Sequence, residues 1–127
     1  MNIIKKPVTN YEKGRRGNIP RCVVWHIGEG NRNAIYSEFL NNEKSSHFCV
    51  NNDGSVWKFV EVENTAWHAG IVVKHTAPIL KDFPNLNPNF ISIGVENEGY
   101  GNFEIDEQQY LLNAELDHRH HFREDFR

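Results

Sequence analysis

The sequence predicts an α/β domain in which a mixed central β-sheet is flanked by helices. One observation predicts this fold class, and two others predict that the chain forms a single domain with one core. The predicted elements follow the order strand, helix, hairpin, strand, helix. The length of 127 residues suits one domain. A hydrophobic fraction of 39% is enough for one modest core. We expect residues 1–20, which mix prolines and glycines with polar and basic residues, to form an N-terminal arm, and residues 21–127 to form the domain.

The first half of the chain supplies a strand, a helix and a hairpin. Residues 22–27 are apolar and rich in β-branched and aromatic types, which predicts a buried strand. Apolar residues recur at helical spacing over residues 31–42, and Asn31 or Asn33 can cap this helix. Strands at 46–50 and 55–60 enclose the turn signal Asn51-Asn52-Asp53-Gly54, which predicts a β-hairpin.

The second half contains a long irregular segment, a strand and a helix. Residues 62–90 include three prolines, and so long a loop inside a compact domain is usually functional. A strand is expected at 90–96, and a helix begins at Asp106 and carries apolar residues as far as Leu116. Residues 117–127 are almost all charged or histidine, so the apolar helical pattern does not continue there.

Composition excludes several classes of function. The formal net charge of −3 argues against a dedicated nucleic-acid binder, because phosphate binding requires a basic face. No stretch approaches the length of a membrane span, and no apolar run follows the lysines of residues 1–6, so we expect neither a membrane partner nor a signal peptide. Cys22 and Cys49 are too few for a disulfide framework and are expected to be buried free thiols.

Two histidines are candidates for chemistry. His26 ends an apolar strand and is either a hydrogen-bonded core residue or a zinc ligand, since active-site residues often lie where strands give way to loops. His68 lies in Ala66-Trp67-His68-Ala69-Gly70. It is either an exposed residue of a structural turn or a polar contact beside a sugar- or peptide-binding cleft, with Trp67 offering an aromatic face.

One carboxylate is a candidate general base. Strand alternation places Glu96 on the same face as Ser92 and Gly94. A carboxylate that closes an apolar strand is costly to bury unpaired, and near a metal-bound water it would make a natural base. The alternative is a solvated strand end. Glu98 continues the same face and is expected to be exposed.

Taken together, these segments resemble the zinc-dependent N-acetylmuramoyl-L-alanine amidases, a family that includes phage lysozyme-type endolysins, bacterial autolysins and the peptidoglycan recognition proteins. The resemblance runs from about Cys22 to about Leu116. It is carried by four motifs in the family's order, which are Val23-Val24-Trp25-His26, Ser45-Ser46-His47-Phe48-Cys49-Val50 with the turn and strand after it, Ala66-Trp67-His68-Ala69-Gly70, and Ser92-Ile93-Gly94-Val95-Glu96.

The resemblance implies hydrolysis of the amide between N-acetylmuramic acid and L-alanine in bacterial peptidoglycan. It implies a Zn2+ cofactor with His26 as a ligand, Glu96 as the catalytic residue that helps to deprotonate a zinc-activated water, and Trp67, His68 and His47 as substrate-binding residues. Some members carry a tyrosine just before the position of His47. Ser46 stands there in this chain, so no tyrosine role carries over.

The resemblance also implies two further zinc ligands, a histidine and then an aspartate or cysteine, beyond the last long helix, where this sequence ends. Three explanations stay open. The chain is a truncated amidase, a natural short form that binds cell wall without cutting it, or a form whose tail supplies ligands. The candidates in the tail are His118 and His121, whose spacing of three puts both on one helical face.

The missing signal peptide suggests a phage endolysin, cytoplasmic until released and acting at the bacterial cell wall, or an autolysin exported by another route. The remaining hypothesis is a generic mixed α/β domain whose motifs match the family by chance.

Overall fold

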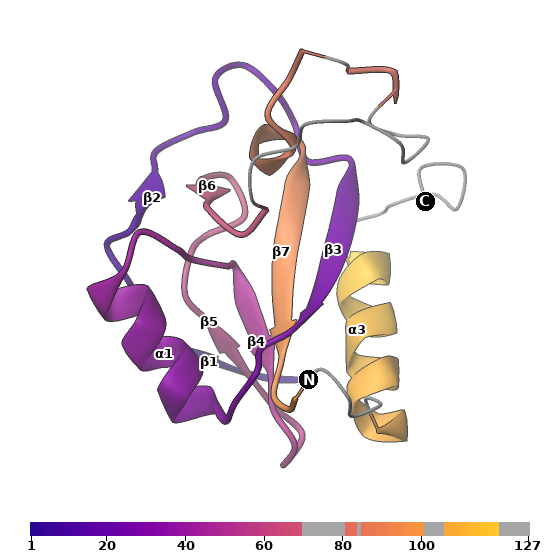
Figure 1. Ribbon diagram of the computed structural model, residues 1–127. Helices are drawn as coiled ribbons and strands as arrows, with labels where there is room; N and C mark the ends of the chain where they lie inside the picture. The colour runs from indigo at the N-terminus through magenta and orange to yellow at the C-terminus, as the bar shows by residue number, and fades with distance from the viewer. Residues whose placement is uncertain (70–80, 84, 101–105, 120–127) are drawn as a thin grey trace.

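The central element of the fold is a five-stranded sheet (Figure 1) with the strand order β1-β5-β4-β7-β3. The computed structural model describes residues 1–69, 81–83, 85–100 and 106–119. The β4–β5 pair is antiparallel, whereas β1–β5, β4–β7 and β3–β7 are parallel, so the sheet is mixed, as the sequence predicts. The strands are β1 (Asn2–Lys5), β3 (Cys22–Ile27), β4 (Phe48–Val50), β5 (Ser55–Lys58) and β7 (Ser92–Asn97).

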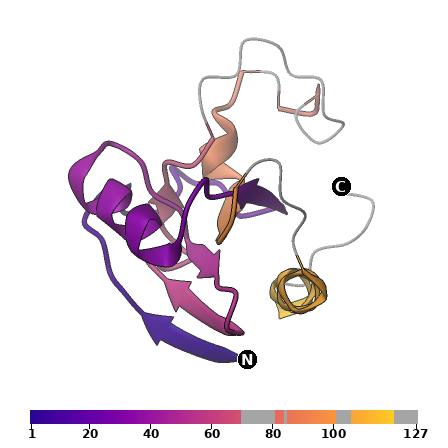
Figure 2. The ribbon, with the colours of Figure 1, turned by 60° about the horizontal axis from the view of Figure 1, so that its bottom comes forward.

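Two helices cover opposite sides of this sheet (Figure 2), α1 (Arg32–Asn41) and α3 (Glu107–Arg119). Both begin at a side-chain cap. The Asn31 Oδ1 accepts a hydrogen bond from the backbone N–H of Ala34 at 2.9 Å, and the Asp106 Oδ1 accepts one from the backbone N–H of Gln109 at 2.8 Å. These bonds satisfy amide groups that a first helical turn leaves without partners. The predicted start of each helix is confirmed.

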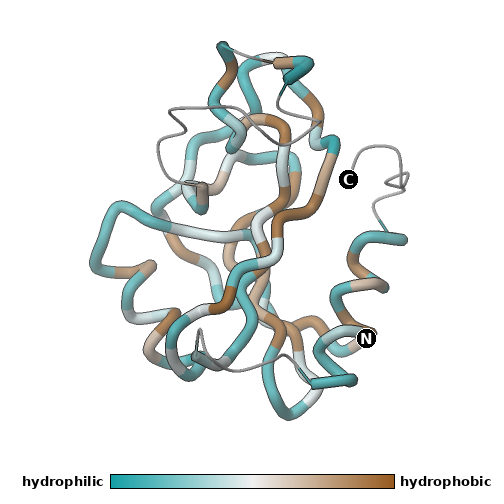
Figure 3. The backbone as a smooth tube through the Cα atoms, turned by 45° about the vertical axis from the view of Figure 1, so that its right-hand side comes forward, coloured by the Kyte–Doolittle hydropathy of each residue, from teal (hydrophilic) through white to brown (hydrophobic). Residues whose placement is uncertain are grey.

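The core is divided between the two faces of the sheet because strand side chains alternate. On one face, Ile35 and Phe39 of α1 belong to the same buried cluster as Cys49 and Trp57. On the other face, Leu116 of α3 packs in a second cluster, whose strand residues are Phe48, Val50, Val56, Ile93 and Val95. The apolar residues of the central strands stand out in Figure 3. Both cysteines are free, and Cys49 is buried while Cys22 is partly exposed.

The N-terminal segment differs from the expected arm. Strand β1 pairs in parallel with β5 and forms one edge of the sheet. Further on, Val8 and Arg15 are each only 4% exposed, and β2 (Tyr11–Glu12) pairs with β6 (Thr65–Ala66) in a small second sheet. The prediction of a separate arm was wrong, because residues 1–20 are part of the sheet and core of the same domain.

The predicted hairpin is confirmed, and the described part of the long irregular segment includes two short elements. Gly54 has a φ of +88°, a conformation that suits glycine at the end of the turn between β4 and β5. The segment 62–90 includes β6 and the 3-10 helix η1 (Pro88–Phe90), which leads directly into β7. The remaining predictions for residues 70–80, and the tail histidines His120 and His121, lie outside the described residues.

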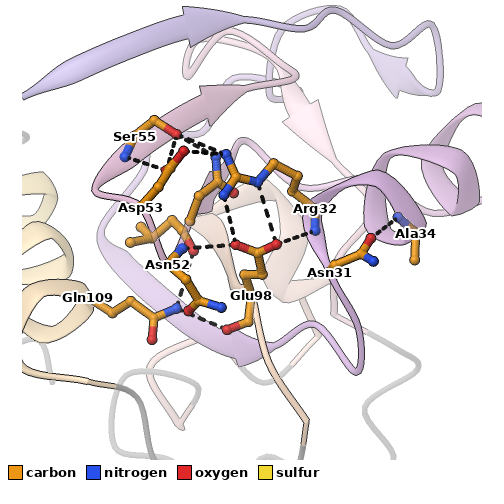
Figure 4. Close-up of polar contacts among 10 residues, drawn as sticks. Asn31, Arg32, Ala34, Asn52, Asp53, Ser55, Glu98 and Gln109 are labelled. Atoms are coloured by element: carbon orange, nitrogen blue, oxygen red, sulfur yellow. Dashed lines mark hydrogen bonds and ion pairs between the residues drawn. The ribbon is translucent and has the colours of Figure 1, made fainter.

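Glu98 is buried, contrary to the expectation of an exposed side chain. It is 7% exposed and accepts hydrogen bonds from the backbone N–H groups of Arg32 (2.8 Å) and Asn52 (2.9 Å). The Arg32 guanidinium lies 3.3 Å away and also pairs with Asp53 at 2.7 Å (Figure 4). Burial alone would raise the pKa of Glu98, but these hydrogen bonds and the charge of Arg32 outweigh burial and lower the pKa. The carboxylate therefore ties the start of α1 to the hairpin turn.

None of the helices in the described part of the chain has the length and apolar character that crossing a bilayer requires.

Candidate active site

A pocket of about 630 Å³ opens where β3 and β7 approach their carboxyl ends and α1 begins to cover the sheet. Four residues singled out from the sequence lie in its wall, namely His26, Trp67, His68 and Glu96. The pocket also contains Glu38 and Lys44 from α1 and the segment after it, which the sequence analysis did not single out. Carboxyl ends of parallel strands are common places for ligand sites in α/β folds.

Strand pairing itself brings His26 and Glu96 together. In the parallel pairing of β3 with β7, His26 is the direct partner of Glu96. Paired residues of neighbouring strands point to the same face, so the imidazole and the carboxyl group both face the pocket. Burial, with a smaller contribution from the nearby charge of Glu38, raises the pKa of Glu96 to about 7, and the charge of Lys44 opposes the rise. Near neutral pH this carboxyl group can therefore both accept and return a proton.

His26 is joined to His68 and Ser92 by a chain of hydrogen bonds. The Nε2 of His26 lies 3.0 Å from the Nδ1 of His68, and the Nε2 of His68 lies 3.0 Å from the Ser92 hydroxyl. The Ser92 hydroxyl in turn donates to the carbonyl oxygen of Pro88 at 2.7 Å. Burial lowers the pKa of His26, and burial followed by the charges of neighbouring histidines lowers that of His68, so both rings are neutral at pH 7.

The ring of His68 lies on the backbone of Gly94. A Cβ atom at position 94 would lie 2.3 Å from the Cγ of His68, so any side chain there would displace the imidazole. The backbone is held by Asn89, whose Oδ1 accepts from the N–H groups of His68 (3.1 Å) and Ala69 (2.9 Å) and whose Nδ2 donates to the Ala69 carbonyl at 3.0 Å. The loop histidine is thus fixed at both its ring and its backbone.

His47, which the family resemblance implies as a substrate contact, is fully buried. Its Nδ1 accepts from the backbone N–H of Gly94 at 3.1 Å, so its Nε2 carries the proton and donates to the Asn64 carbonyl at 2.9 Å. The Arg15 guanidinium lies 3.2 Å from the same Nε2, but guanidinium groups only donate, so this is a close contact and not a hydrogen bond. The structure therefore contradicts direct substrate contact and gives His47 a role in holding β7 in place.

Arg15 supports the site and was not recognised in the sequence. Its side chain donates to the carbonyl oxygens of Val62 (2.9 Å), Asn89 (3.3 Å), Phe90 (3.2 Å) and Ser92 (3.0 Å). Burial lowers its pKa to about 10, so the guanidinium is charged at neutral pH. The sequence gives no sign of this role, because Arg15 is one of several basic residues in the segment predicted to be an N-terminal arm.

Trp67 lies in the pocket wall and is partly exposed. Its backbone N–H donates to the Ser45 hydroxyl at 3.0 Å, and its ring meets that of Phe90 edge to face with centroids 6.0 Å apart. The indole is thus available to a ligand while its backbone is fixed.

The tail histidine His118 does not join this constellation. It is exposed near the end of α3, and α3 packs through Leu116 on the sheet face opposite to His26 and Glu96. His121 lies outside the described residues. Within residues 1–69, 81–83, 85–100 and 106–119, no group of three or more histidine, cysteine, aspartate or glutamate side chains could hold a metal ion.

Comparison with known proteins gives one family and a set of similar structures. A family model described as N-acetylmuramoyl-L-alanine amidase matches residues 6–119. The chain is similar to the crystal structure of a selenomethionine derivative of AmpD, with a TM-score of 0.69 and 20% identity over 93% of this chain and 75% of that one.

Two further similar structures come from Clostridium intestinale URNW. The N-acetylmuramoyl-L-alanine amidase LysC gives a TM-score of 0.60 at 15% identity, over 96% of this chain and 78% of its own. The endolysin LysCS, also an N-acetylmuramoyl-L-alanine amidase, gives 0.59 at 15% identity, over 95% and 76%. At these identities the likeness shows a shared fold. No curated protein sequence matches the chain significantly.

Proposed function

Because the chain belongs to the N-acetylmuramoyl-L-alanine amidase family, we propose that it hydrolyses the amide bond between N-acetylmuramic acid and L-alanine in bacterial peptidoglycan. The observation that supports this most directly is the pair formed by His26 and Glu96, which lie side by side in one pocket, with the pKa of Glu96 raised to about 7. Bacterial peptidoglycan is the proposed partner and the cell wall the proposed place of action.

Glu96 has the properties of a general base followed by a general acid. Its carboxylate takes a proton from water as the water oxygen attacks the amide carbonyl carbon. It then returns this proton to the nitrogen of L-alanine as the carbon–nitrogen bond breaks. The products are a carboxyl group on the lactyl side and a free amino group on the peptide. A pKa near the working pH suits both steps. The indole of Trp67 offers an apolar surface for a sugar or peptide group.

Zinc is a separate proposal, with His26 as one ligand. A neutral imidazole is a suitable donor. Catalytic zinc sites take three protein ligands, however, and the described residues contain no such group around His26. The described residues thus do not by themselves fit a complete zinc site. Dialysis against zinc followed by metal analysis tests the proposal. Less than about 0.1 zinc per chain would contradict it.

The amidase proposal is tested on purified cell walls. We expect new amino-terminal L-alanine without new reducing sugar ends, which separates an amidase from a glycosidase. Glu96→Gln should lower the rate by at least about 100-fold, because general acid–base catalysis is lost. Glu43→Gln, a change in the wall of the same pocket, is the matched control and should keep most of the activity. Reducing ends in place of L-alanine, or an active Glu96→Gln variant, would refute the mechanism.

A second candidate function is binding of peptidoglycan without cleavage. It is favoured by one observation, the lack of a three-ligand group among the described residues. It predicts that the chain sediments with cell walls, that no L-alanine amino termini appear, and that Trp67→Ala weakens the binding. Release of L-alanine amino termini by the unmodified chain would exclude this candidate.

A further inference from the structure

We propose that Ser92 is a positioning residue that acts through the ring of His68. It fixes His26 in the tautomer with the proton on Nε2, so that Nδ1 is the ring nitrogen with a free electron pair. The inference rests on the proposed function only in treating His26 as an active-site residue. It concerns the direction of a hydrogen-bond chain whose three links are 3.0, 3.0 and 2.7 Å long.

The direction of the chain follows from its last link. The carbonyl oxygen of Pro88 can only accept, so the single hydroxyl proton of Ser92 points to it. The Ser92 oxygen can then only accept from His68, and the Nε2 of His68 must carry a proton. A neutral imidazole has one N–H, so the Nδ1 of His68 is bare and accepts from the Nε2 of His26. The same rule leaves the Nδ1 of His26 without a proton.

The ring of His68 is held in this orientation by its packing on Gly94 and by its two hydrogen bonds. Its Cγ and Cδ2 would lie 2.3 and 2.6 Å from a Cβ at Gly94, so the ring occupies the space that a side chain would otherwise fill. Asn89 holds the backbone on either side of the peptide bond between His68 and Ala69. A ring flip would place carbon atoms where both nitrogens now bond, and both hydrogen bonds would be lost.

The opposite direction of the chain is disfavoured at the buried end. If His26 carried its proton on Nδ1, His68 would have to donate through Nδ1 and accept at Nε2 from the Ser92 hydroxyl. That hydroxyl would then turn away from the carbonyl oxygen of Pro88, a buried residue. The two oxygen atoms would face each other at 2.7 Å with no proton between them, and the carbonyl would keep only its longer hydrogen bond from the Ile91 N–H at 3.2 Å. Ser92 is itself 1% exposed, so water cannot readily replace the lost contact.

The consequence is that His26 would bind an electrophile or cation, or accept a proton, through Nδ1. The Nε2 side is already committed to His68. Ser92 does not contact His26 directly. It affects His26 only through His68, by fixing which ring nitrogen of His68 donates and which accepts.

The test is the tautomeric state of the histidines in 15N-labelled protein at neutral pH, read from two-bond 1H–15N correlations. In the unmodified chain both His26 and His68 should be Nε2–H. For His26 this form should exceed Nδ1–H at least about tenfold, because the reversed chain breaks the 2.7 Å hydrogen bond from the Ser92 hydroxyl to the Pro88 carbonyl and leaves two buried oxygen atoms in contact. Ser92→Ala should reduce that ratio at least about fivefold. Ser46→Ala, which removes a buried hydroxyl bonded to the Phe48 carbonyl, is the matched control and should not change it.

An unmodified chain in which His26 is Nδ1–H or doubly protonated would overturn the proposal, and so would a folded Ser92→Ala variant with an unchanged His26 tautomer. Should Ser92→Ala fail to fold, the spectrum of the unmodified chain decides the direction by itself. The measurement uses no substrate and no turnover, so its failure is distinct from failure of the proposed amidase activity.

Discussion

Glu96 and Glu98 lie two residues apart around the end of β7 and should respond to pH in opposite ways. For Glu96 the decisive change is Glu96→Gln, which keeps the shape of the side chain and removes its charge. Burial raises the pKa of Glu96 from 4.5 to about 7. The folded chain therefore binds more protons than the unfolded chain between these two values, and its stability falls as the pH rises through that window.

The size of the effect follows from the two pKa values. One pH unit corresponds to about 1.4 kcal/mol, so ionising Glu96 costs about 3 kcal/mol of folding free energy once the pH exceeds about 7. Below about pH 4.5 the carboxyl group is neutral in both states and the cost is absent. We expect Glu96→Gln to match the parent at about pH 4 and to exceed its free energy of unfolding by up to about 3 kcal/mol at about pH 8.

Urea denaturation at several pH values measures this difference directly, with m-values compared to check that both chains unfold alike. Glu98→Gln is the control with the opposite sign. The pKa of Glu98 is lowered, so its charge stabilises the fold above about pH 4.5 and that stabilisation is lost as the pH falls further. A Glu96→Gln variant that is less stable than the parent at about pH 8, or whose advantage does not change with pH, would refute the reasoning.

Three further substitutions test how the site is held. Gly94→Ala should displace the His68 ring, lowering stability by about 1–3 kcal/mol and abolishing release of L-alanine; a fully active variant would contradict the close ring contact. Asn89→Ala removes the acceptor for two loop N–H groups and should cost about 1–3 kcal/mol in urea denaturation, with unchanged stability as the contrary result. Arg32→Ala leaves the buried Glu98 carboxylate without its guanidinium and should cost at least about 2 kcal/mol at neutral pH but much less near pH 3; a loss that is equal at both pH values would argue against an ionic cause.

The candidate site was largely predictable because its residues lie on regular strands or in a distinctive loop motif. Alternation along β7 placed Ser92, Gly94 and Glu96 on one face, and the structure confirms this through their contacts with His68 and the pocket. The position of His26 at a strand end was enough to direct it to the same pocket. Strand alternation and the position of a residue at a strand end are local patterns, so both can be recognised in a single sequence.

The predictions that failed depended on partners far away in the chain. Glu98 is buried because Arg32 and Asn52 supply its hydrogen bonds, and neither residue is near it in sequence. Strand β1 has only two apolar residues, and its pairing with β5 decides that it is a strand. Arg15 is buried because four carbonyl groups converge on it from other segments. Contacts between residues so far apart in the chain cannot be predicted from the local sequence pattern around any one of them.

The two ways in which the site is assembled imply an order of opening in the native state. His26 and Glu96 are adjacent because all six residues of the edge strand β3 pair with β7, so they separate only when this strand comes away from the sheet. His68 lies in a loop and is held by its packing on Gly94, by the side chain of Asn89 and by the hydrogen bonds of its ring to His26 and Ser92. Local fluctuations can release such a loop without global unfolding. Opening of the loop disrupts fewer backbone contacts than separation of β3 from β7, so we expect His68 to be released before the strand pair comes apart.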